Sequence, residues 1–369
     1  MVDSRKGVAD RFTYDIKSPP IGEGHFSKVY KGFDKLRPGV PVAIKLITTE
    51  TLKQYEGQGD IFDREVKILE RIVGDTFLRS IASFKDERGL HLVMDYCEGD
   101  SLSKKIKDLT EGQTFPEEDA LDIAYEVAYA FYSLPKIGLK TESGKPATLI
   151  HRDIKPGNLL FKEGKIKIVD FGLSEIIEDE TKNNQVFNQD AGTLFWMSPQ
   201  ILKKLVYSSK TDVFSLGVVL YEMLHGDVPW GKANHFILAE RVLTKTPVIK
   251  KTLKPETIHL LKSMLSTSEE DRPGWDELVQ HPAFAEAKER VARKKPVQKP
   301  INSQSVMIKF DEKPVQADSK SSNLTASMTI VKQPPLKVLP NGIEILSQNF
   351  KPKVYLFENA KKTVRILPD

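Results

Sequence analysis

The feature that most constrains the fold is the stretch at residues 151–158, which reads His-Arg-Asp-Ile-Lys-Pro-Gly-Asn. It places a carboxylate (Asp153), an ammonium group (Lys155) and a carboxamide (Asn158) within six residues. The proline and glycine between the last two disfavour a regular helix, so we predict a loop. Loops held on a rigid scaffold often carry the chemistry of a protein, and this loop is therefore the first candidate site.

A second motif follows twelve residues after Asn158. Residues 165–169 alternate in the manner of a strand, and Asp170-Phe171-Gly172 comes directly after them. Together the two motifs provide an acid/base carboxylate, two oxygen ligands for a hard cation and a fixed positive charge. Transfer of a phosphoryl group from a nucleotide–magnesium complex needs such a set. In these motifs the chain resembles the protein kinase family.

The resemblance implies a role for each polar residue of these motifs. Asp153 would act as the catalytic base, and Lys155 would neutralise charge on the transferred group. Asn158 and Asp170 would hold Mg²⁺. Lys45, in Val-Ala-Ile-Lys, would hold the ATP phosphates, and Glu65 would be its partner.

The resemblance also implies an ATP site that begins at a glycine-rich turn. On its own, Gly22-Glu23-Gly24 is weak evidence and is typical of an ordinary hairpin turn, and Ser27 stands where the family has a third glycine. Cys97 is compatible with an inert small hydrophobic residue whose backbone alone contacts adenine. The implied ATP-binding residues are Ile21, Gly22, Glu23, Gly24, Val29, Ala43, Lys45, Asp95, Cys97, Leu160 and Asp170.

The segment from Asp170 to Gln200 is the implied activation segment. Thr193 fits the threonine that contacts the catalytic loop in serine/threonine kinases, and Lys155 is also typical of that class. We predict that Asp190 pairs with Arg152 and orders the segment without phosphorylation. Phosphorylation of Thr181 is the competing hypothesis.

Two further positions test the resemblance. The glutamate that normally pairs with a buried arginine, here Arg272, is replaced by Gln200. We predict a locally softened large lobe with activity retained.

Asp212, at the start of an apolar helix, is implied to anchor the catalytic loop. Residues 197–202, 220–224 and 229–230 resemble the autophagy-initiating (ULK-type) kinases.

Composition bounds the remaining possibilities. At 40% apolar and 29% charged residues, the chain is typical of a globular protein. It shows no signal peptide and no apolar run long enough for a transmembrane segment. Its single cysteine suits a reducing compartment, so we expect a cytoplasmic location, with the nucleus as the alternative. We expect no nucleic-acid partner.

The basic excess lies at the C-terminal end. Residues 286–369 contain 16 Lys and Arg against 8 Asp and Glu, a net +8; since the whole chain is +4, residues 1–285 carry −4. A solvated linker explains this excess, and binding to an acidic partner or a membrane surface is the alternative.

We therefore predict an α+β, two-lobed protein kinase fold with a C-terminal extension. Its parts are an N-terminal segment (1–10), a kinase domain (11–285), a basic linker rich in Pro and Ser (286–335) and a short β-rich tail (336–369). Within the domain, the lobes are 11–94 and 100–285, and the hinge is 95–99. A helix over 61–72 is predicted, with Asp60 as its N-cap.

The implied function is transfer of the γ-phosphoryl group of ATP to serine or threonine of protein substrates, with Mg²⁺. The alternative is a pseudokinase-like scaffold that binds ATP and recruits a protein partner through its tail.

Overall fold

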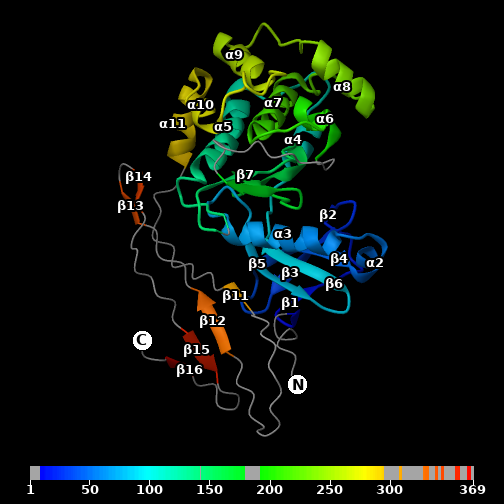
Figure 1. The fold of residues 1–369 in the computed structure, drawn as a ribbon, viewed down its shortest axis with the longest axis vertical. Coiled ribbons are helices and arrows are strands. Elements are labelled where there is room, and N and C mark those ends of the chain that lie inside the picture. Colours follow the sequence, from blue (N-terminus) through cyan, green and yellow to red (C-terminus); the bar gives the residue numbers. More distant parts are fainter. Residues whose placement is uncertain are drawn as a thin grey trace. The chain divides into compact units, whose positions relative to one another are not determined.

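The structure is a computed structural model that describes residues 9–141, 143–178 and 192–294, together with six short strands after residue 306. The chain divides into two compact units, Met1–Val297 and Gln298–Asp369. Figure 1 traces the elements of each unit.

The first unit begins with a small lobe built on an antiparallel sheet. The strands are β1 (Phe12–Tyr14), β2 (Gly22–Glu23), β3 (Lys28–Asp34), β4 (Pro41–Thr48), β5 (Ser80–Lys85) and β6 (Gly89–Asp95). Their order is β1-β3-β4-β6-β5, and β2 pairs with β3. β4 and β6 lie centrally and are buried along most of their length, which fits their content of Val, Ile and Leu.

Two helices connect β4 to β5. They are α2 (Thr49–Gln54), which was not predicted, and α3 (Gln58–Arg71), which lies across one face of the sheet (Figure 1). α3 buries Phe62, Glu65 and Leu69. The predicted N-cap Asp60 is wrong: the cap is Gly57, whose φ of 79° lets the chain turn sharply from α2 into α3. Asp60 lies in the first turn instead, where a negative charge favours the helix dipole.

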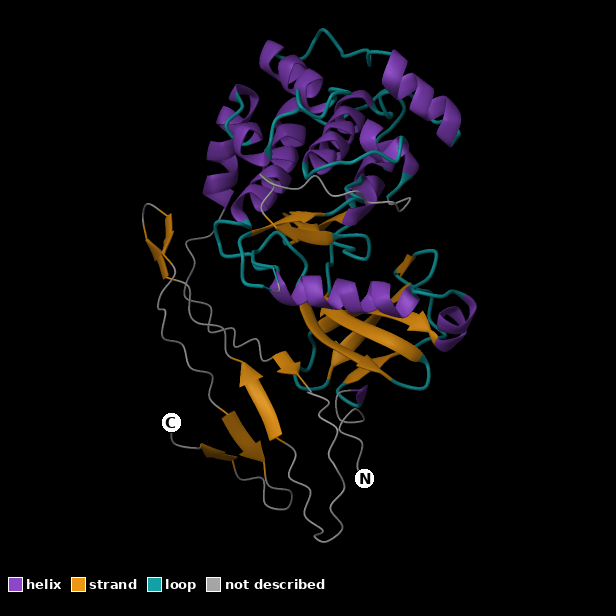
Figure 2. Cartoon of the chain, in the orientation of Figure 1, coloured by secondary structure: helices purple, strands orange, loops and turns teal. Residues whose placement is uncertain are grey.

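The large lobe is mostly helical (Figure 2). Its helices are α4 (Leu102–Lys107), α5 (Glu117–Ser133), α6 (Pro199–Leu202), α7 (Lys210–His225), α8 (His235–Thr244), α9 (Pro255–Met264), α10 (Trp275–Leu278) and α11 (Ala285–Lys294), with 3₁₀ turns η1 (Pro156–Asn158), η2 (Leu194–Trp196) and η3 (Pro282–Phe284). α5 and α7 form the centre of the core, and α7 is buried on nearly all sides. Among the described residues, none of these helices combines the length and apolar character needed to cross a bilayer.

Two short antiparallel strand pairs frame the catalytic loop. β7 (Ala147–Ile150) leads into the loop and pairs with β10 (Glu175–Glu178). β8 (Leu159–Lys162) leaves it and pairs with β9 (Lys165–Ile168). The loop and the Asp170 motif are therefore brought side by side, because each is held at the end of a paired strand.

α11 extends the first unit past the predicted domain boundary at residue 285. Ala287 and Val291 are buried, α11 packs on α5, and the Nε of Arg290 lies 2.9 Å from an Asp122 carboxylate oxygen. The prediction that residues 286–294 belong to the linker is therefore wrong. The cause is their composition, since a helix held by two apolar side chains and an ion pair looks like a solvated segment in sequence.

The second unit contains only strands among its described residues. β11 (Met307–Lys309), β12 (Ser327–Val331), β15 (Val354–Phe357) and β16 (Val364–Ile366) form an antiparallel sheet in that order. β13 (Lys337–Leu339) and β14 (Gly342–Glu344) pair separately. The predicted tail strands thus have counterparts in the structure, while β11 and β12 fall in the stretch predicted as linker.

Candidate active site

The catalytic loop is mounted on α7 through one buried carboxylate. Asp212 is fully buried, and its two oxygens accept the backbone N–H groups of His151 (2.6 Å) and Arg152 (2.8 Å). Arg152 has φ +66°, a conformation that a non-glycine residue adopts only when its surroundings impose it. Asp212 therefore has the anchoring role that the sequence implied.

His151 is a neutral structural residue in this loop. Its ring is completely buried, and this burial lowers its pKa below the ordinary value. Nδ1 accepts the backbone N–H of Asp153 (3.3 Å), which leaves the proton on Nε2 to be donated to the Val169 carbonyl (3.1 Å). The ring thereby ties the loop to the residue that precedes Asp170.

The carboxylate of Asp153 is the centre of a short hydrogen-bond network. Lys155 donates to Oδ2 (2.6 Å), and Thr193 donates to Oδ1 (2.8 Å). The amide of Asn158 donates to Oδ2 (2.9 Å) and to the Asp153 carbonyl (2.8 Å). Lys155 also donates to the Thr193 hydroxyl (2.6 Å). Three predicted residues therefore surround the Asp153 carboxylate and fix its orientation.

A second group of predicted residues surrounds the Lys45 ammonium. Nζ lies 2.8 Å from a Glu65 carboxylate oxygen and 2.9 Å from Asp170 Oδ1. Burial alone would lower the Lys45 pKa, but the two carboxylates raise it above the ordinary value. Lys45 in turn lowers the pKa of Asp170, and Lys155 contributes to this shift. The two groups thus belong to one electrostatic site in which Lys45 is a permanent cation.

The motif after Asp170 is held by packing. Phe171 is buried against His151 (ring centroids 5.1 Å apart) and Phe77 (6.2 Å). Asp170 itself has φ +67°, the second left-handed non-glycine residue of the site. The buried ring fixes the backbone, and the strained turn directs the carboxylate to Lys45.

Two of the implied ATP-binding residues, Val29 and Ala43, lie on one face of the small-lobe sheet. Val29 lies opposite Lys45 and Ala43 lies opposite Met94, and opposed residues of antiparallel strands project to the same face. Leu160 lies on β8, where it bridges to Ser101, and Ile21 is exposed just before β2. These positions are compatible with two apolar walls around a planar base.

The hinge residues Asp95 and Cys97 have different environments. The N–H of Asp95 donates to the Arg79 carbonyl (3.1 Å). Burial raises the pKa of the Cys97 thiol to about 11, so this cysteine is a protonated, weakly reactive side chain at neutral pH. The prediction that Cys97 is inert agrees with this environment.

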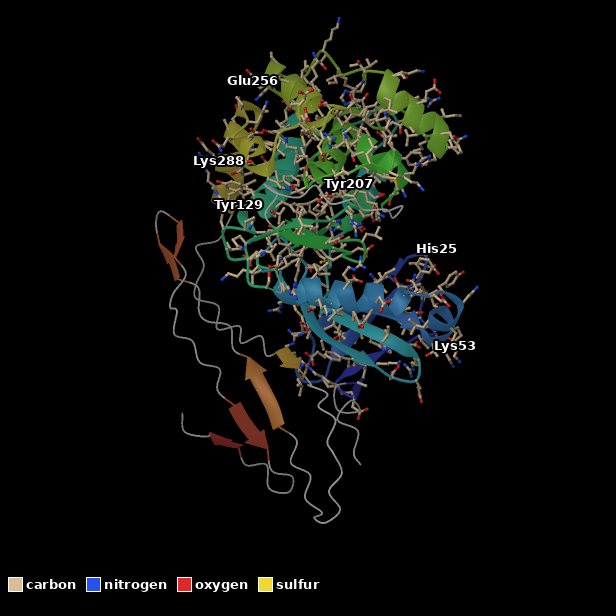
Figure 3. The ribbon with its side chains drawn as sticks, in the orientation of Figure 1. His25, Lys53, Tyr129, Tyr207, Glu256 and Lys288 are labelled. Atoms are coloured by element: carbon tan, nitrogen blue, oxygen red, sulfur yellow. The ribbon has the colours of Figure 1, made fainter. Side chains whose placement is uncertain are left out.

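The glycine-rich turn closes tightly between β2 and β3. Gly22 pairs with Val29 and Glu23 with Lys28, and the Gly24 N–H donates to the Ser27 carbonyl (2.8 Å). The rings at its tip continue into α2, since Phe26 meets Tyr55 with centroids 5.0 Å apart. In Figure 3, His25 and Lys53 of α2 are labelled at the same end of the small lobe. Tyr55 was missed in the sequence because nothing local links it to the turn.

The Arg152 guanidinium contacts groups that were not predicted. Its guanidinium is buried; Nη2 lies 3.5 Å from a Glu175 carboxylate oxygen, and Nη1 donates to the Tyr207 hydroxyl (3.5 Å). Its Nε donates to the Leu173 carbonyl. Glu175 and Tyr207, which is labelled in Figure 3, were both missed in the sequence.

The predicted partners of Arg152 are not described by the structure. Asp190 and Thr181 lie outside the described residues, so their roles stay predictions. Glu175 has no local signal in the sequence, because its contact with Arg152 depends on the pairing of β10 with β7.

Gln200 and Arg272 meet as predicted. Nη2 of Arg272 donates to the Gln200 side-chain oxygen, and Nη1 donates to the Lys210 carbonyl (2.7 Å). Arg272 Nε is buried without a partner among the described residues, and burial lowers the pKa of the guanidinium to about 10. No carboxylate replaces the expected glutamate in these contacts.

Comparison with known proteins finds a family model and several relatives that each match more than two thirds of this chain. A model of the protein kinase domain matches residues 16–284. Serine/threonine-protein kinase TOUSLED of Arabidopsis thaliana is 32% identical over 285 residues, which cover 73% of this chain and 40% of that protein. Serine/threonine-protein kinase 36 of Pongo abelii is 30% identical over 266 residues, covering 72% and 19%.

A third relative comes from another group of kinases. Calcium-dependent protein kinase 3 of Plasmodium yoelii yoelii is 29% identical over 299 residues, which cover 77% of this chain and 52% of that protein. The chain thus spans between about a fifth and a half of the length of these relatives.

Proposed function

The chain belongs to the protein kinase domain family, and on this premise we propose that it transfers the γ-phosphoryl group of ATP to serine or threonine hydroxyls of proteins. The observation that carries the proposal is the Asp153 carboxylate, which Lys155, Asn158 and Thr193 hold in one orientation. The names of the relatives support the choice of serine and threonine.

The chemical step assigns one role to Asp153. The substrate hydroxyl oxygen forms a bond to the γ-phosphorus, the bond from this phosphorus to the β–γ bridging oxygen breaks, and ADP leaves. The hydroxyl proton passes to an Asp153 carboxylate oxygen. Lys155, which donates to the same carboxylate, is close enough to balance negative charge on the transferred group. Thr193 belongs to the activation segment, and its hydrogen bond to Asp153 holds that residue of the segment next to the catalytic carboxylate.

The donor set fits Mg²⁺. Both hydrogens of the Asn158 amide nitrogen are engaged by Asp153, so the amide oxygen is the atom that remains to ligate. The Asp170 carboxylate is partly exposed, with one oxygen on Lys45. One or two protein oxygens are enough for Mg²⁺ because phosphates and water complete its shell. When bound, the ion would neutralise the charge of the phosphates.

Lys45 would hold the phosphates from the small-lobe side. Its ammonium is a permanent cation, and Glu65 fixes it from a buried position on α3. A displacement of α3 would withdraw Glu65 and leave the ammonium to Asp170 alone. The position of α3 is therefore expected to control turnover.

The apolar residues after Thr193 give the proposed substrate class some detail. Leu194, Phe195, Trp196 and Met197 are partly buried and follow the residue that touches Asp153. Trp196 is fixed by its Nε1, which donates to Glu222 (3.1 Å), and by its carbonyl, which accepts from Ser215 (2.7 Å). We propose an apolar residue directly after the phosphoacceptor, which positional scanning of peptides would test.

The scaffold alternative is not favoured, because every residue that the reaction requires is present and in contact with its partner. A protein partner for the C-terminal unit and a cytoplasmic location remain part of the proposal. The second rests on the single cysteine alone.

The direct test is Mg²⁺-dependent phosphate transfer from ATP to a generic protein substrate, beside the Asp153→Ala variant. We expect transfer in the wild type and a loss of about 10³-fold or more in the variant. Binding of Mg–ATP by both proteins is the control for folding. Wild-type protein that binds Mg–ATP and transfers nothing would contradict the proposal and favour the scaffold.

A further inference from the structure

The outer face of α8 carries large apolar side chains with no role in the core. Phe236 is 84% exposed, and Ile237 and Leu243 are also exposed. The inner face of the helix is complete without them, because Leu238 and Val242 are buried there. Exposed apolar groups clustered in this way commonly mark a binding surface.

The helix that presents this face is held rigidly. Asn234 caps its first turn, with the side-chain oxygen accepting the Ile237 N–H (3.1 Å). Its other end is fixed to Trp230, whose Nε1 donates to the Lys245 carbonyl (2.8 Å) and whose carbonyl accepts from Arg241 (3.0 Å). Trp230 stacks on Phe214 of α7. Because these contacts already fix the helix, its surface loses little conformational entropy when a partner binds.

The charge around the face is predominantly positive. Residues 232–254 contain six Lys and Arg and one acid, Glu240, whereas residues 1–285 as a whole carry −4. Lys245 and Lys251 are exposed on the loop that follows α8, and Val248 between them is 82% exposed. The surface therefore combines apolar and cationic groups against an acidic background.

The location of this surface connects it to the substrate. α8 packs against α6, which begins directly after the segment that contains Thr193 and the apolar residues next to it. A polypeptide that presents its hydroxyl at Asp153 would thus have further residues within reach of α8.

We propose that α8 and the loop at 245–251 form a docking surface for an acidic segment, containing apolar residues, of the protein substrate. This inference rests on the proposed kinase function and adds a substrate class to it. The apolar side chains supply contact area, and the lysines select negative charge and reject basic proteins. Short peptides that reach only Asp153 gain nothing from the surface.

The test compares substrates of opposite charge on full-length protein. β-Casein serves as the acidic substrate, myelin basic protein as the basic one, and a short serine peptide as the minimal one. The variants are Phe236→Ser with Val248→Ser, and Lys245→Glu with Lys251→Glu. For both we expect the KM for β-casein to rise about 10-fold, with kcat and the other two KM values changed less than about 2-fold.

Matched controls alter equally exposed residues elsewhere. Leu36→Ser removes an apolar side chain that is 71% exposed, and Lys53→Glu reverses an exposed charge on α2. Neither should change any KM. Equal changes for all three substrates, or no change for β-casein in the α8 variants, would overturn the inference.

Two outcomes are separated by further measurements. Fluorescence anisotropy of labelled β-casein reports binding without turnover, so a wild type that binds β-casein through α8 but transfers no phosphate would contradict the proposed function alone. Loss of binding to phosphatidylserine vesicles in the variants, with unchanged affinity for β-casein, would identify a lipid-binding surface and reject the docking proposal.

Discussion

At the scale of single residues, Arg272 has a buried guanidinium that no carboxylate contacts among the described residues. Its contacts are the Gln200 and Lys210 oxygens and the Phe214 ring, whose centroid is 5.4 Å away. Two neutral oxygens compensate a buried cation only in part, and the lowered pKa of Arg272 reflects this. The cost falls on the stability of the large lobe and does not reach the Asp153 network.

The first prediction follows from this contact. Gln200→Glu would place a carboxylate against Arg272 and should raise the free energy of unfolding by about 1–2 kcal/mol, a net value because the hydrogen bond from Gln200 to the Thr267 carbonyl is lost. Thermal unfolding would show a higher Tm with unchanged kcat. An unchanged Tm would contradict this explanation.

Arg152 carries the second prediction. Glu175→Gln removes the carboxylate that lies 3.5 Å from its guanidinium and keeps the side-chain size. If Glu175 orders the loop, kcat of phosphatase-treated enzyme should fall about 10-fold, with little change in the KM for ATP. Steady-state kinetics on treated enzyme is the measurement.

Glu256→Gln, an exposed change on α9 labelled in Figure 3, is the matched control. An unchanged kcat in Glu175→Gln would leave Asp190, or phosphorylated Thr181, as the predicted anion for Arg152. Asp190→Ala would then be the next variant to compare.

At the scale of elements, one buried carboxylate joins the first strand to the third. Asp34, at the end of β3, lies 2.7 Å from a nitrogen of Arg11 before β1 and 2.7 Å from a nitrogen of Arg37. It also accepts the Leu36 N–H (3.0 Å). The Arg11 hydrogen bond is the largest cause of a pKa for Asp34 well below the usual range. The corner of the sheet therefore depends on a charge.

The third prediction uses the pH dependence of this corner. Because the pKa of Asp34 is lowered on folding, its stabilisation is fully present above the unfolded value of 3.8 and is lost as the pH falls towards the folded value. Asp34→Asn should reduce the free energy of unfolding by about 3 kcal/mol at pH 7 and by progressively less below pH 3.8.

Denaturant unfolding of both proteins between pH 2 and pH 7 measures this difference. Asp63→Asn, an exposed change on α3, should behave as the wild type at every pH. A difference between Asp34→Asn and wild type that stays constant across the range would show that the corner depends on packing and not on ionisation.

At the scale of the whole molecule, the first unit contains everything that the proposed reaction uses. Its end is set by α11, which covers α5 with Ala287 and Val291 and with the ion pair between Arg290 and Asp122. The residues assigned to the reaction all precede residue 201, so the second unit supplies none of them. We therefore expect that removal of the second unit by truncation leaves the catalytic activity intact.

The fourth prediction compares two truncated chains. A chain that ends at Lys294 should keep the wild-type Tm and kcat, whereas one that ends at Phe284 should lose about 3 kcal/mol of stability, because two buried apolar side chains and an ion pair are removed. Differential scanning calorimetry and peptide phosphorylation test both. Loss of activity in the longer chain would assign a catalytic role to the second unit.

Much of the site follows from sequence because its contacts are local or tied to a motif. Asp153, Lys155 and Asn158 lie within six residues, and Lys45 was identifiable from the strand around it. Contacts between separate elements were harder, since they depend on strand pairing and helix placement. Glu175 reaches Arg152 only because β10 pairs with β7.

Short helices were also missed for a physical reason. α2 has six residues and no buried side chain, so it leaves no apolar period in the sequence. α11 has an apolar stripe of few residues within a highly charged segment. Both helices are stabilised by contacts with elements that are distant in sequence. The pattern of residues along the chain does not show these contacts.

The partly buried hinge thiol has a practical consequence for spectroscopy. Cys97 is the only cysteine of the chain, and its pKa of about 11 leaves on the order of one thiolate in 10⁴ at pH 7. Maleimide dyes should therefore react very slowly with the wild-type protein under mild conditions. A cysteine placed on the surface, such as Phe236→Cys on α8, would accept a dye selectively, and the motion of that surface could be followed without first removing a native thiol.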